Sequence, residues 1–228
     1  MNKTHASLAR GLQARRRAFT HLLLQGALAG LLTLTGTGAQ AAPRNLLILG
    51  DSISAEYGLP RDSGWVRLLA ERLKTSAYDY NVINASISGD TTIGGRGRLP
   101  DLLRQHKPAI VIIELGGNDG LRGLDPRAME DNLGAMISAA SRSGARVLLV
   151  GMRLPPNYGR DYNSRFEAVY PALAARLKVP LVRFLFEGLG QTDEFFQADR
   201  IHPTVRSQAL LLDNVWPVLK PLLRQGKT

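Results

Sequence analysis

The chain has 228 residues and no cysteine, which excludes a disulfide framework, a cysteine nucleophile, a thiolate metal site and a lipid-modified cysteine anchor. Its formal net charge is +10, from 29 basic and 19 acidic residues. The basic residues are scattered, with little aromatic interleaving, so we expect no nucleic-acid partner.

The first forty residues do not resemble part of a folded domain. Residues 1–21 carry five basic side chains and no acid, residues 22–34 are largely apolar, and small residues then lead to Gln40-Ala41-Ala42. This order predicts a secretory signal peptide over residues 1–41 and a periplasmic location for the mature protein. A membrane anchor helix is the alternative, but the apolar stretch is shorter than the roughly 20 residues that span a bilayer.

Removal of residues 1–41 would leave a domain over residues 42–228, which is long enough for one sizeable core. It would also remove the five basic residues of the export segment and lower the net charge to +5. Arg16-Arg17 in that segment resembles a twin-arginine export signal. We expect the mature domain to be a soluble monomer with no stable membrane insertion.

Beyond residue 42, short apolar runs alternate with amphipathic stretches. Strands are predicted at Asn45–Leu49, Tyr80–Asn84, Ile110–Leu115, Val147–Gly151 and Pro180–Val182. Helices are predicted at Gly64–Thr75, Leu99–Gln105, Pro126–Ser143, Tyr162–Lys178 and Pro203–Leu223, the last with a possible break at Pro217. Continuous apolar strands suit a sheet that is covered on both faces. The alternation therefore predicts a doubly wound parallel α/β fold with three layers, α/β/α.

Ligands of such sheets bind outside the carboxyl ends of the strands, where this chain places its polar motifs. Those motifs are Gly50-Asp51-Ser52, Ser88-Gly89-Asp90-Thr91 and Gly116-Gly117-Asn118-Asp119, which follow the first three strands, and Asp199-Arg200-Ile201-His202, which precedes the last helix. Each motif alone is also an ordinary turn or helix cap. Together they place a hydroxyl, an imidazole, a carboxylate and an amide at one edge of the sheet.

Ser52 is the candidate nucleophile, because it follows the first strand on a tight turn that points its hydroxyl and its N–H toward one small volume. A serine needs a positioned base, and the chain has four histidines. His5 and His21 lie in the predicted signal peptide, and His106 stands at a predicted helix end, where capping explains it. His202 remains, three residues after a carboxylate.

These residues can be assembled into a serine triad. Ser52 would attack, His202 would accept its proton, and Asp199 would orient the imidazole and stabilise its cation. The N–H groups of Ser52 and Gly89 and the side-chain amide of Asn118 would form the oxyanion hole. Glycine at position 89 lets backbone approach a substrate closely.

The sequence resembles the SGNH (GDSL) hydrolase superfamily. The motifs that carry the resemblance are Gly50-Asp51-Ser52-Ile53-Ser54, Gly89, Gly116-Gly117-Asn118-Asp119 and Asp199-x-x-His202-Pro203, and the four signature residues would be Ser52, Gly89, Asn118 and His202. Residues 115–123 and 152–159 are also similar to those of a bacterial group that comprises arylesterase, multifunctional acyl-CoA thioesterase I and lysophospholipase L1. One departure is Arg200, where a small residue such as glycine is expected.

The resemblance implies a flavodoxin-like sheet of five parallel strands, hydrolysis of acyl esters and thioesters, no cofactor and a periplasmic enzyme. The substrate would be a small molecule with an apolar acyl tail. The loop Leu154-Pro155-Pro156-Asn157-Tyr158-Gly159 follows the fourth strand and borders the crevice, so Leu154 and Tyr158 are the candidate substrate-binding residues.

Three other interpretations were weighed. A carbohydrate deacetylase of the same superfamily would release acetate and turn over long acyl chains poorly. A cation-binding module would use Asp51, Asp90 and Asp119 as an acidic pocket, but residues 42–228 offer no third histidine for a metal site and no His-x-x-x-His pair, so we expect no metal. Gly94-Gly95-Arg96-Gly97 lacks the G-x-G-x-x-G fingerprint, so a flexible loop is expected there rather than a phosphate site.

Overall fold

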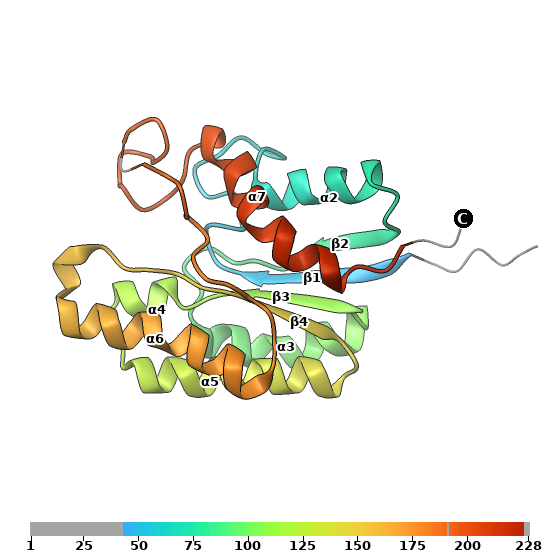
Figure 1. Ribbon diagram of the computed structural model, residues 1–228, viewed down its shortest axis with the longest axis horizontal. Coiled ribbons are helices and arrows are strands. Elements are labelled where there is room, and N and C mark those ends of the chain that lie inside the picture. The colour runs from blue at the N-terminus through green and yellow to red at the C-terminus, as the bar shows by residue number, and fades with distance from the viewer. Residues whose placement is uncertain (1–42, 191, 226–228) are drawn as a thin grey trace, which may run out of the picture. The chain divides into compact units, whose positions relative to one another are not determined.

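A five-stranded parallel sheet forms the centre of the fold (Figure 1). The computed structural model describes residues 43–190 and 192–225, so the predicted signal peptide lies outside the described residues. The strands are β1 (Arg44–Gly50), β2 (Tyr80–Asn84), β3 (Ile110–Glu114), β4 (Arg146–Val150) and β5 (Leu181–Val182). Their order is β2-β1-β3-β4-β5 and every pairing is parallel. This order is that of the flavodoxin-like folds, which confirms the predicted fold class.

Helices cover both faces of the sheet. They are α2 (Trp65–Thr75), α3 (Thr92–His106), α4 (Gly117–Leu121), α5 (Pro126–Arg142), α6 (Arg160–Leu177) and α7 (Gln208–Leu219), with 3-10 turns η1 (Pro156–Tyr158), η2 (Val205–Ser207) and η3 (Lys220–Leu222). α2 and α7 lie on one face, and α3, α5 and α6 lie on the other (Figure 1). The three predicted layers are therefore present. No helix within residues 43–190 and 192–225 is long and apolar enough to cross a bilayer.

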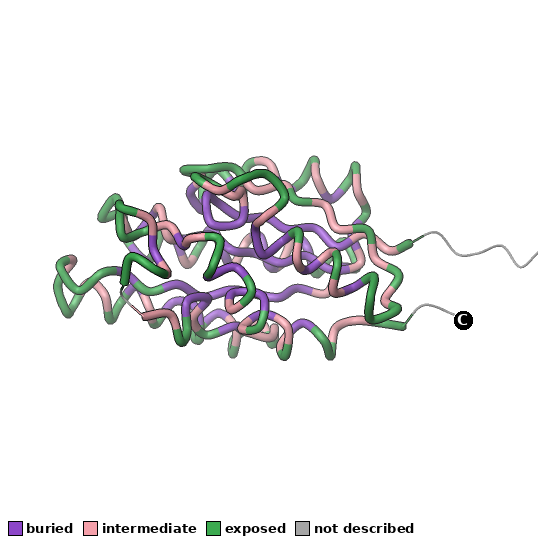
Figure 2. The backbone as a smooth tube through the Cα atoms, turned by 90° about the horizontal axis from the view of Figure 1, so that it is seen from above, coloured by how far each residue is buried: buried purple, intermediate pink, exposed green. Residues whose placement is uncertain are grey.

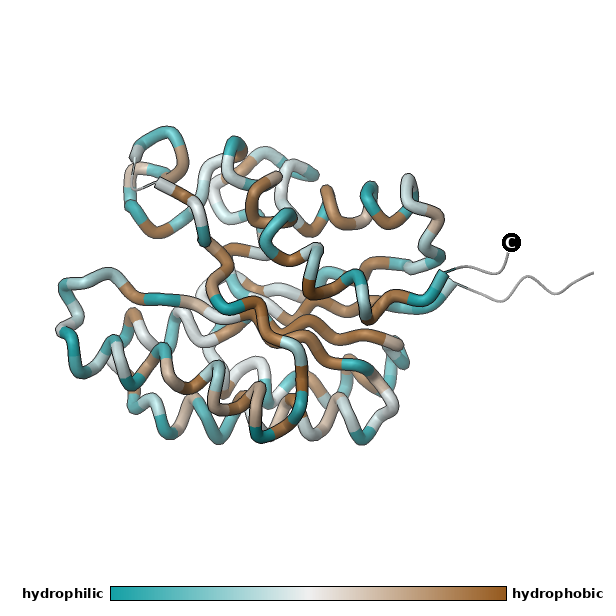
Figure 3. The backbone as a smooth tube through the Cα atoms, viewed as in Figure 1, coloured by the Kyte–Doolittle hydropathy of each residue, from teal (hydrophilic) through white to brown (hydrophobic). Residues whose placement is uncertain are grey.

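The core is built on the central strands, which explains why they read as continuous apolar runs. The side chains of Leu46–Leu49 and Ile110–Ile113 are fully buried from both faces. Figure 2 shows buried residues concentrated in the interior of the trace with exposed residues around its rim, and Figure 3 shows the strands as the most hydrophobic part of the trace. A rigid sheet of this kind holds the loops at its carboxyl edge in fixed positions, and the candidate site is built from those loops.

The start of α3 differs from the prediction. The helix begins at Thr92, seven residues before the expected Leu99, so the glycine cluster 94–97 is helical and the expected flexible loop is wrong. The N–H of Thr92 donates to Asp119 Oδ2 at 2.9 Å, so a carboxylate from α4 satisfies the first turn. Gly95 packs against the sheet, where a Cβ would lie 2.3 Å from Leu115 Cδ1.

The last helix, by contrast, begins later than predicted. Residues 205–207 form the 3-10 turn η2, and α7 starts at Gln208 rather than at Pro203. Pro217 does not break the helix, which continues to Leu219 before the 3-10 turn η3. The segment before α7 is instead held by a bridge between Phe196 and Pro203, which fixes the residues on either side of His202.

Candidate active site

Three side chains from two distant loops form a continuous hydrogen-bonded chain. Ser52 lies on the turn after β1, and its Oγ is 2.9 Å from Nε2 of His202. The other ring nitrogen of His202, Nδ1, lies 2.6 Å from Asp199 Oδ2. The structure thus brings together the predicted nucleophile, base and carboxylate, although 150 residues separate Ser52 from His202.

The loop that carries Asp199 and His202 is fixed by its own backbone. Asp199 Oδ1 accepts hydrogen bonds from the N–H groups of Ile201 (2.9 Å) and His202 (3.0 Å). Partial burial would raise the pKa of the Asp199 carboxyl, but the hydrogen bonds from the N–H and imidazole of His202 and from the Ile201 N–H hold that pKa below its usual value. Asp199 is therefore ionised at neutral pH and holds the imidazole in one orientation.

Arg200 has a left-handed backbone with φ +60°, which explains why a small residue such as glycine is expected at this position. Its guanidinium pairs with Asp193 at 2.6 Å. On the other side of the loop, the ring of Tyr57 packs against the imidazole of His202 with ring centroids 4.5 Å apart. The departure from the expected glycine therefore leaves the contacts between Ser52, His202 and Asp199 intact.

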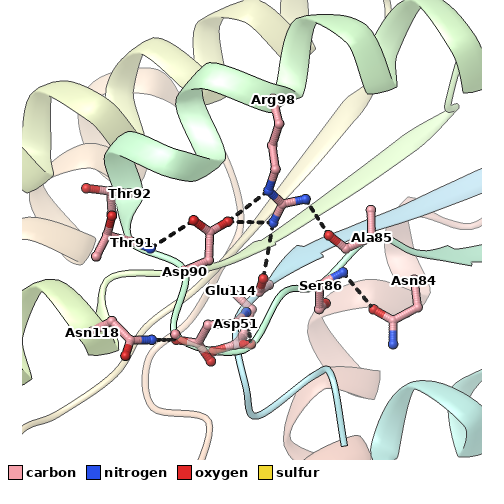
Figure 4. A network of polar contacts seen from close by, with 12 residues as sticks. Asp51, Asn84, Ala85, Ser86, Asp90, Thr91, Thr92, Arg98, Glu114 and Asn118 are labelled. Atoms are coloured by element: carbon pink, nitrogen blue, oxygen red, sulfur yellow. Dashed lines mark hydrogen bonds and ion pairs between the residues drawn. The ribbon is translucent and has the colours of Figure 1, made fainter.

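The three predicted oxyanion donors come from the turn after β1, the loop after β2 and the start of α4. Gly89 has φ +78°, a conformation that favours glycine, and its carbonyl accepts from Arg122 Nη2 at 2.9 Å. Within residues 43–190 and 192–225, the N–H groups of Ser52 and Gly89 donate to no protein acceptor. Asn118 is the second residue of α4, and its Nδ2 donates one hydrogen bond to Asp51 Oδ2 at 3.1 Å (Figure 4). An amide nitrogen has two hydrogens, so the second remains for a substrate oxygen.

The sequence profile of the GDSL-like lipase/acylhydrolase family matches residues 48–210, a span that holds all of these side chains. The chain is also 55% identical to esterase TesA of Pseudomonas aeruginosa over 202 residues, which is 89% of this chain and 98% of that protein.

The chain belongs to the GDSL-like lipase/acylhydrolase family.

Two further comparisons agree with this assignment. A protein of Escherichia coli K12 named thioesterase 1/protease 1/lysophospholipase L1 is 44% identical over 183 residues, which is 80% of this chain and 86% of that protein. The crystal structure of TesA superposes with a TM-score of 0.77 at 56% identity and covers 79% of this chain and 100% of that one. The chain is therefore a GDSL-type hydrolase, as the sequence motifs predicted.

Two buried carboxyl groups lie beside the turn that carries Ser52, the candidate nucleophile. Asp51 is 2% exposed, and burial raises its pKa to about 6 against the lowering effect of hydrogen bonds from the Ile53 N–H and Asn118. Glu114, at the end of β3, is fully buried and accepts from the Ser54 hydroxyl at 2.7 Å. Burial, followed by the nearby Asp51 charge, raises the pKa of Glu114 well above its usual value. Both carboxyl groups are therefore harder to ionise than an exposed carboxyl group.

Sequence reasoning missed Glu114, which belongs to no motif of the family pattern that we used. The available signal was a single charged residue in the apolar run Ile110–Leu115, at a strand position where both faces of the sheet are covered. A buried carboxyl group needs hydrogen-bond partners to offset its loss of water. Oε2 of Glu114 accepts from the Ser54 hydroxyl and from the N–H of Asp51, so Glu114 fixes the turn that carries Ser52, whereas Oε1 has no partner among the described residues.

The three aspartates that could have formed a cation pocket instead accept hydrogen bonds from different parts of the hydrolase. Asp51 accepts from Ile53 and Asn118, as described above. Asp90 forms a 2.8 Å ion pair with Arg98, and both oxygens of Asp119 accept from Thr92, through its N–H and its hydroxyl. Each carboxylate is engaged with a donor of its own, which favours a structural role for each over a shared cation.

The predicted substrate-binding residues of the hydrolase pack against α4. Leu154 is 8% exposed and lies against Gly120, where a Cβ would come within 2.5 Å of Leu154 Cδ2. The hydroxyl of Tyr158, in η1, donates to the Leu121 carbonyl at 2.9 Å. Leu154 and Tyr158 therefore support the helix that carries Asn118.

Other apolar side chains are more exposed than Leu154 at this edge of the sheet. They are Tyr57, Ile87, Ile93, Leu124, Ile201 and Val205. All of them lie in loops or first helical turns that follow the carboxyl ends of strands, or in the segment that carries His202. Sequence reasoning missed them, because exposure of an isolated apolar residue leaves no periodic signal in the sequence.

Proposed function

We propose that this hydrolase cleaves carboxylic esters and thioesters of apolar acyl chains, with Ser52, His202 and Asp199 as its catalytic triad. The observation that carries the proposal is the chain of contacts from Ser52 Oγ through both nitrogens of His202 to Asp199, at 2.9 Å and 2.6 Å. These distances lie within the reach that proton transfer between a nucleophile and its base requires.

The first half of the reaction is acylation of Ser52. The Ser52 oxygen attacks the carbonyl carbon while His202 Nε2 accepts its proton, and the ionised Asp199 stabilises the resulting imidazolium. Hydrogen bonds from the N–H groups of Ser52 and Gly89 and from Asn118 Nδ2 stabilise the negative charge on the substrate oxygen. When the tetrahedral intermediate collapses, His202 returns the proton to the departing alcohol or thiol and the acyl group stays on Ser52.

The second half reverses these roles with water. His202 accepts a proton from water, the resulting hydroxide attacks the acyl carbon, and the same three donors bind the oxyanion. Collapse releases the carboxylic acid, and the proton on His202 returns to Ser52 Oγ. Every proton in this scheme is moved by His202, so the reaction as proposed requires no metal and no cofactor.

Two observations support an acyl chain as the substrate's apolar part. The relatives named above are an esterase and a thioesterase/lysophospholipase. The exposed side chains of Tyr57, Ile87 and Ile201 also flank the loops that carry Ser52, Gly89 and His202. Each methylene that these side chains bury contributes about 0.8 kcal/mol at most, so kcat/KM should rise a few-fold per carbon until the apolar surface ends.

The test is a series of p-nitrophenyl esters from acetate to palmitate, with palmitoyl-CoA and a lysophospholipid measured beside them. The proposal expects kcat/KM to rise from acetate to octanoate and expects turnover of the thioester. A rate that is flat or falls with chain length would reject the acyl preference and favour the carbohydrate deacetylase alternative. Addition of EDTA should leave the rates unchanged, and strong inhibition that added metal reverses would favour a cation site.

We further propose that the enzyme is exported to the periplasm and cleaved after Ala41 to give a monomer. The basic, apolar and small-residue order of residues 1–42 supports this location. N-terminal sequencing of the periplasmic enzyme should begin at Ala42 or Pro43, and its elution on a sizing column should match one chain. Recovery of intact Met1 protein from the cytoplasm would contradict export. A loss of export on replacement of Arg16 and Arg17 by lysine would identify the twin-arginine route.

A further inference from the structure

Arg98, in the second turn of α3, contacts three acceptors on two segments at the carboxyl edge of the sheet (Figure 4). Its Nε and Nη2 both lie 2.8 Å from Asp90 Oδ2. Its Nη1 donates to the carbonyl of Ala85, and its Nη2 also donates to the carbonyl of Gly50 at 3.3 Å. The side chains of Arg98 and Asp90 are only 20% and 11% exposed, so water screens this pair little.

The three acceptors belong to the two segments that supply the backbone donors of the oxyanion hole. Gly50 is the last residue of β1 and precedes Ser52, on the following turn, by two residues. Ala85 and Asp90 bracket the loop after β2, and Asp90 directly follows Gly89. One guanidinium therefore spans the turn that carries the Ser52 N–H and the loop that carries the Gly89 N–H.

Asp90 is itself seated against the start of α3. Its Oδ1 accepts from the N–H of Thr91 at 3.0 Å, next to the positive end of the helix. Gly94 leaves room for this carboxylate, because a Cβ at position 94 would lie 2.0 Å from Asp90 Oδ1. Gly94 was expected to lie in a flexible loop, but its missing side chain makes the space in which Asp90 pairs with Arg98.

We propose that Arg98 is a positioning residue that sets the separation between the Ser52 and Gly89 N–H groups, and so the geometry of the oxyanion hole. This inference rests on the proposed function, since it assumes that these N–H groups bind the substrate oxygen. Arginine suits the task because its planar guanidinium has five donors in a fixed arrangement. Lysine would keep the charge opposite Asp90 but has one compact ammonium group, which cannot reach Asp90, Ala85 and Gly50 together in the same geometry.

The expected effect follows from the precision that catalysis requires. A displacement of about 1 Å in a catalytic group costs on the order of 10²-fold in rate, which is close to the loss of one oxyanion donor. Arg98→Lys should therefore lower kcat for p-nitrophenyl butyrate by about 10- to 100-fold. The KM should change little, because the hole binds the transition state more strongly than the ester. Arg104→Lys is the matched control, since Arg104 lies on the same helix in an exposed pair with Asp101.

The inhibition constant of an alkyl boronic acid is a second measurement, which a general loss of stability would not change. The boronic acid forms a reversible tetrahedral adduct with the Ser52 oxygen, whose boron-bound oxygen would occupy the oxyanion hole. In Arg98→Lys the inhibition constant of octylboronic acid should rise by the same factor by which kcat falls, while Arg104→Lys should match the wild type in both. Thermal melting of each variant would establish that the measured protein is folded.

Asp90→Asn is the second variant, and it keeps the shape of the side chain while removing its charge. It should lower kcat in the same direction, and the Asp90→Asn/Arg98→Lys double variant should lose less than the product of the two single losses, because both act through one contact. If Arg98→Lys does not fold, Asp90→Asn alone provides the test. In that variant kcat should fall and the boronate inhibition constant should rise by the same factor.

A folded Arg98→Lys variant with wild-type kcat would overturn the inference, as would a fall in kcat without a change in the boronate inhibition constant. Failure of the proposed function has a different signature. In that case the wild type itself would not be labelled by an organophosphate at Ser52, and Ser52→Ala would stay active.

Discussion

The buried Asp51 carboxylate should make the hydrolase less stable as the pH rises, and Asp51→Asn should remove that dependence. Burial raises the pKa of Asp51 from 3.8 to about 6, so the folded state binds the Asp51 proton more tightly than the unfolded chain does. A group of this kind contributes stability fully below the unfolded pKa, and that contribution is lost as the pH rises through the folded pKa. The difference of about two pKa units corresponds to about 3 kcal/mol.

Urea unfolding of the wild type and of Asp51→Asn, at intervals from pH 3.5 to pH 7.5, measures this contribution. The free energy of unfolding of the wild type should fall by about 3 kcal/mol relative to the variant between about pH 4 and pH 6.5. Burial is the main cause of the raised pKa of Glu114 and is the same in both proteins, so most of the Glu114 contribution cancels in the comparison. Asp101→Asn, which changes an exposed carboxylate, is the control. A difference between wild type and Asp51→Asn that does not vary with pH would refute the reasoning.

Three further outcomes follow from the contacts of the site and of α3. Asn118→Ala should lower kcat by about 10²–10³-fold with little change in KM, and damage confined to KM would mean that Asn118 binds the ground state instead. His202→Ala should be nearly as inactive as Ser52→Ala in steady-state assays, and the double variant should lose little more, whereas additive losses would contradict a triad. Gly95→Ala should lower the free energy of unfolding by about 1–3 kcal/mol in urea titrations, because its Cβ would lie 2.3 Å from Leu115 Cδ1. Gly97→Ala is its matched control and should stabilise the helix by about 0.5–1 kcal/mol, because a Cβ there meets nothing within 4 Å; a loss as large as that of Gly95→Ala would contradict the packing argument.

The sheet could be predicted because burial on both faces forces a continuous apolar run. The segments Leu46–Leu49 and Ile110–Ile113 carry this signal, and both are fully buried strands. The start of α3 could not be predicted in the same way. Its glycines lower helix propensity, and the groups that compensate come from later in the chain: Asp119 of α4 accepts from the N–H of Thr92, and Leu115, directly after β3, packs against Gly95. Tertiary contacts thus decided the one element whose local sequence argued against it.

The candidate site shows a similar division. Ser52, Asp199 and His202 were predictable because nucleophilic chemistry needs a hydroxyl, a base and a carboxylate, and the chain offers few histidines. Glu114 and Arg98 were not, because their roles depend on which backbone segments lie within hydrogen-bond reach of them. Leu154 was expected to line the substrate crevice, but its side chain is buried against α4. The sequence placed its loop at the crevice without giving the direction of each side chain.

The central claim is that Ser52 is the nucleophile activated by His202. Its most direct test is treatment of the purified enzyme with an organophosphate, followed by peptide mapping and mass measurement. We predict one phosphoryl group per chain, attached to Ser52, with loss of activity in proportion to labelling and with little labelling in the His202→Ala variant. Attachment to a different serine, or full activity after stoichiometric labelling of Ser52, would contradict it.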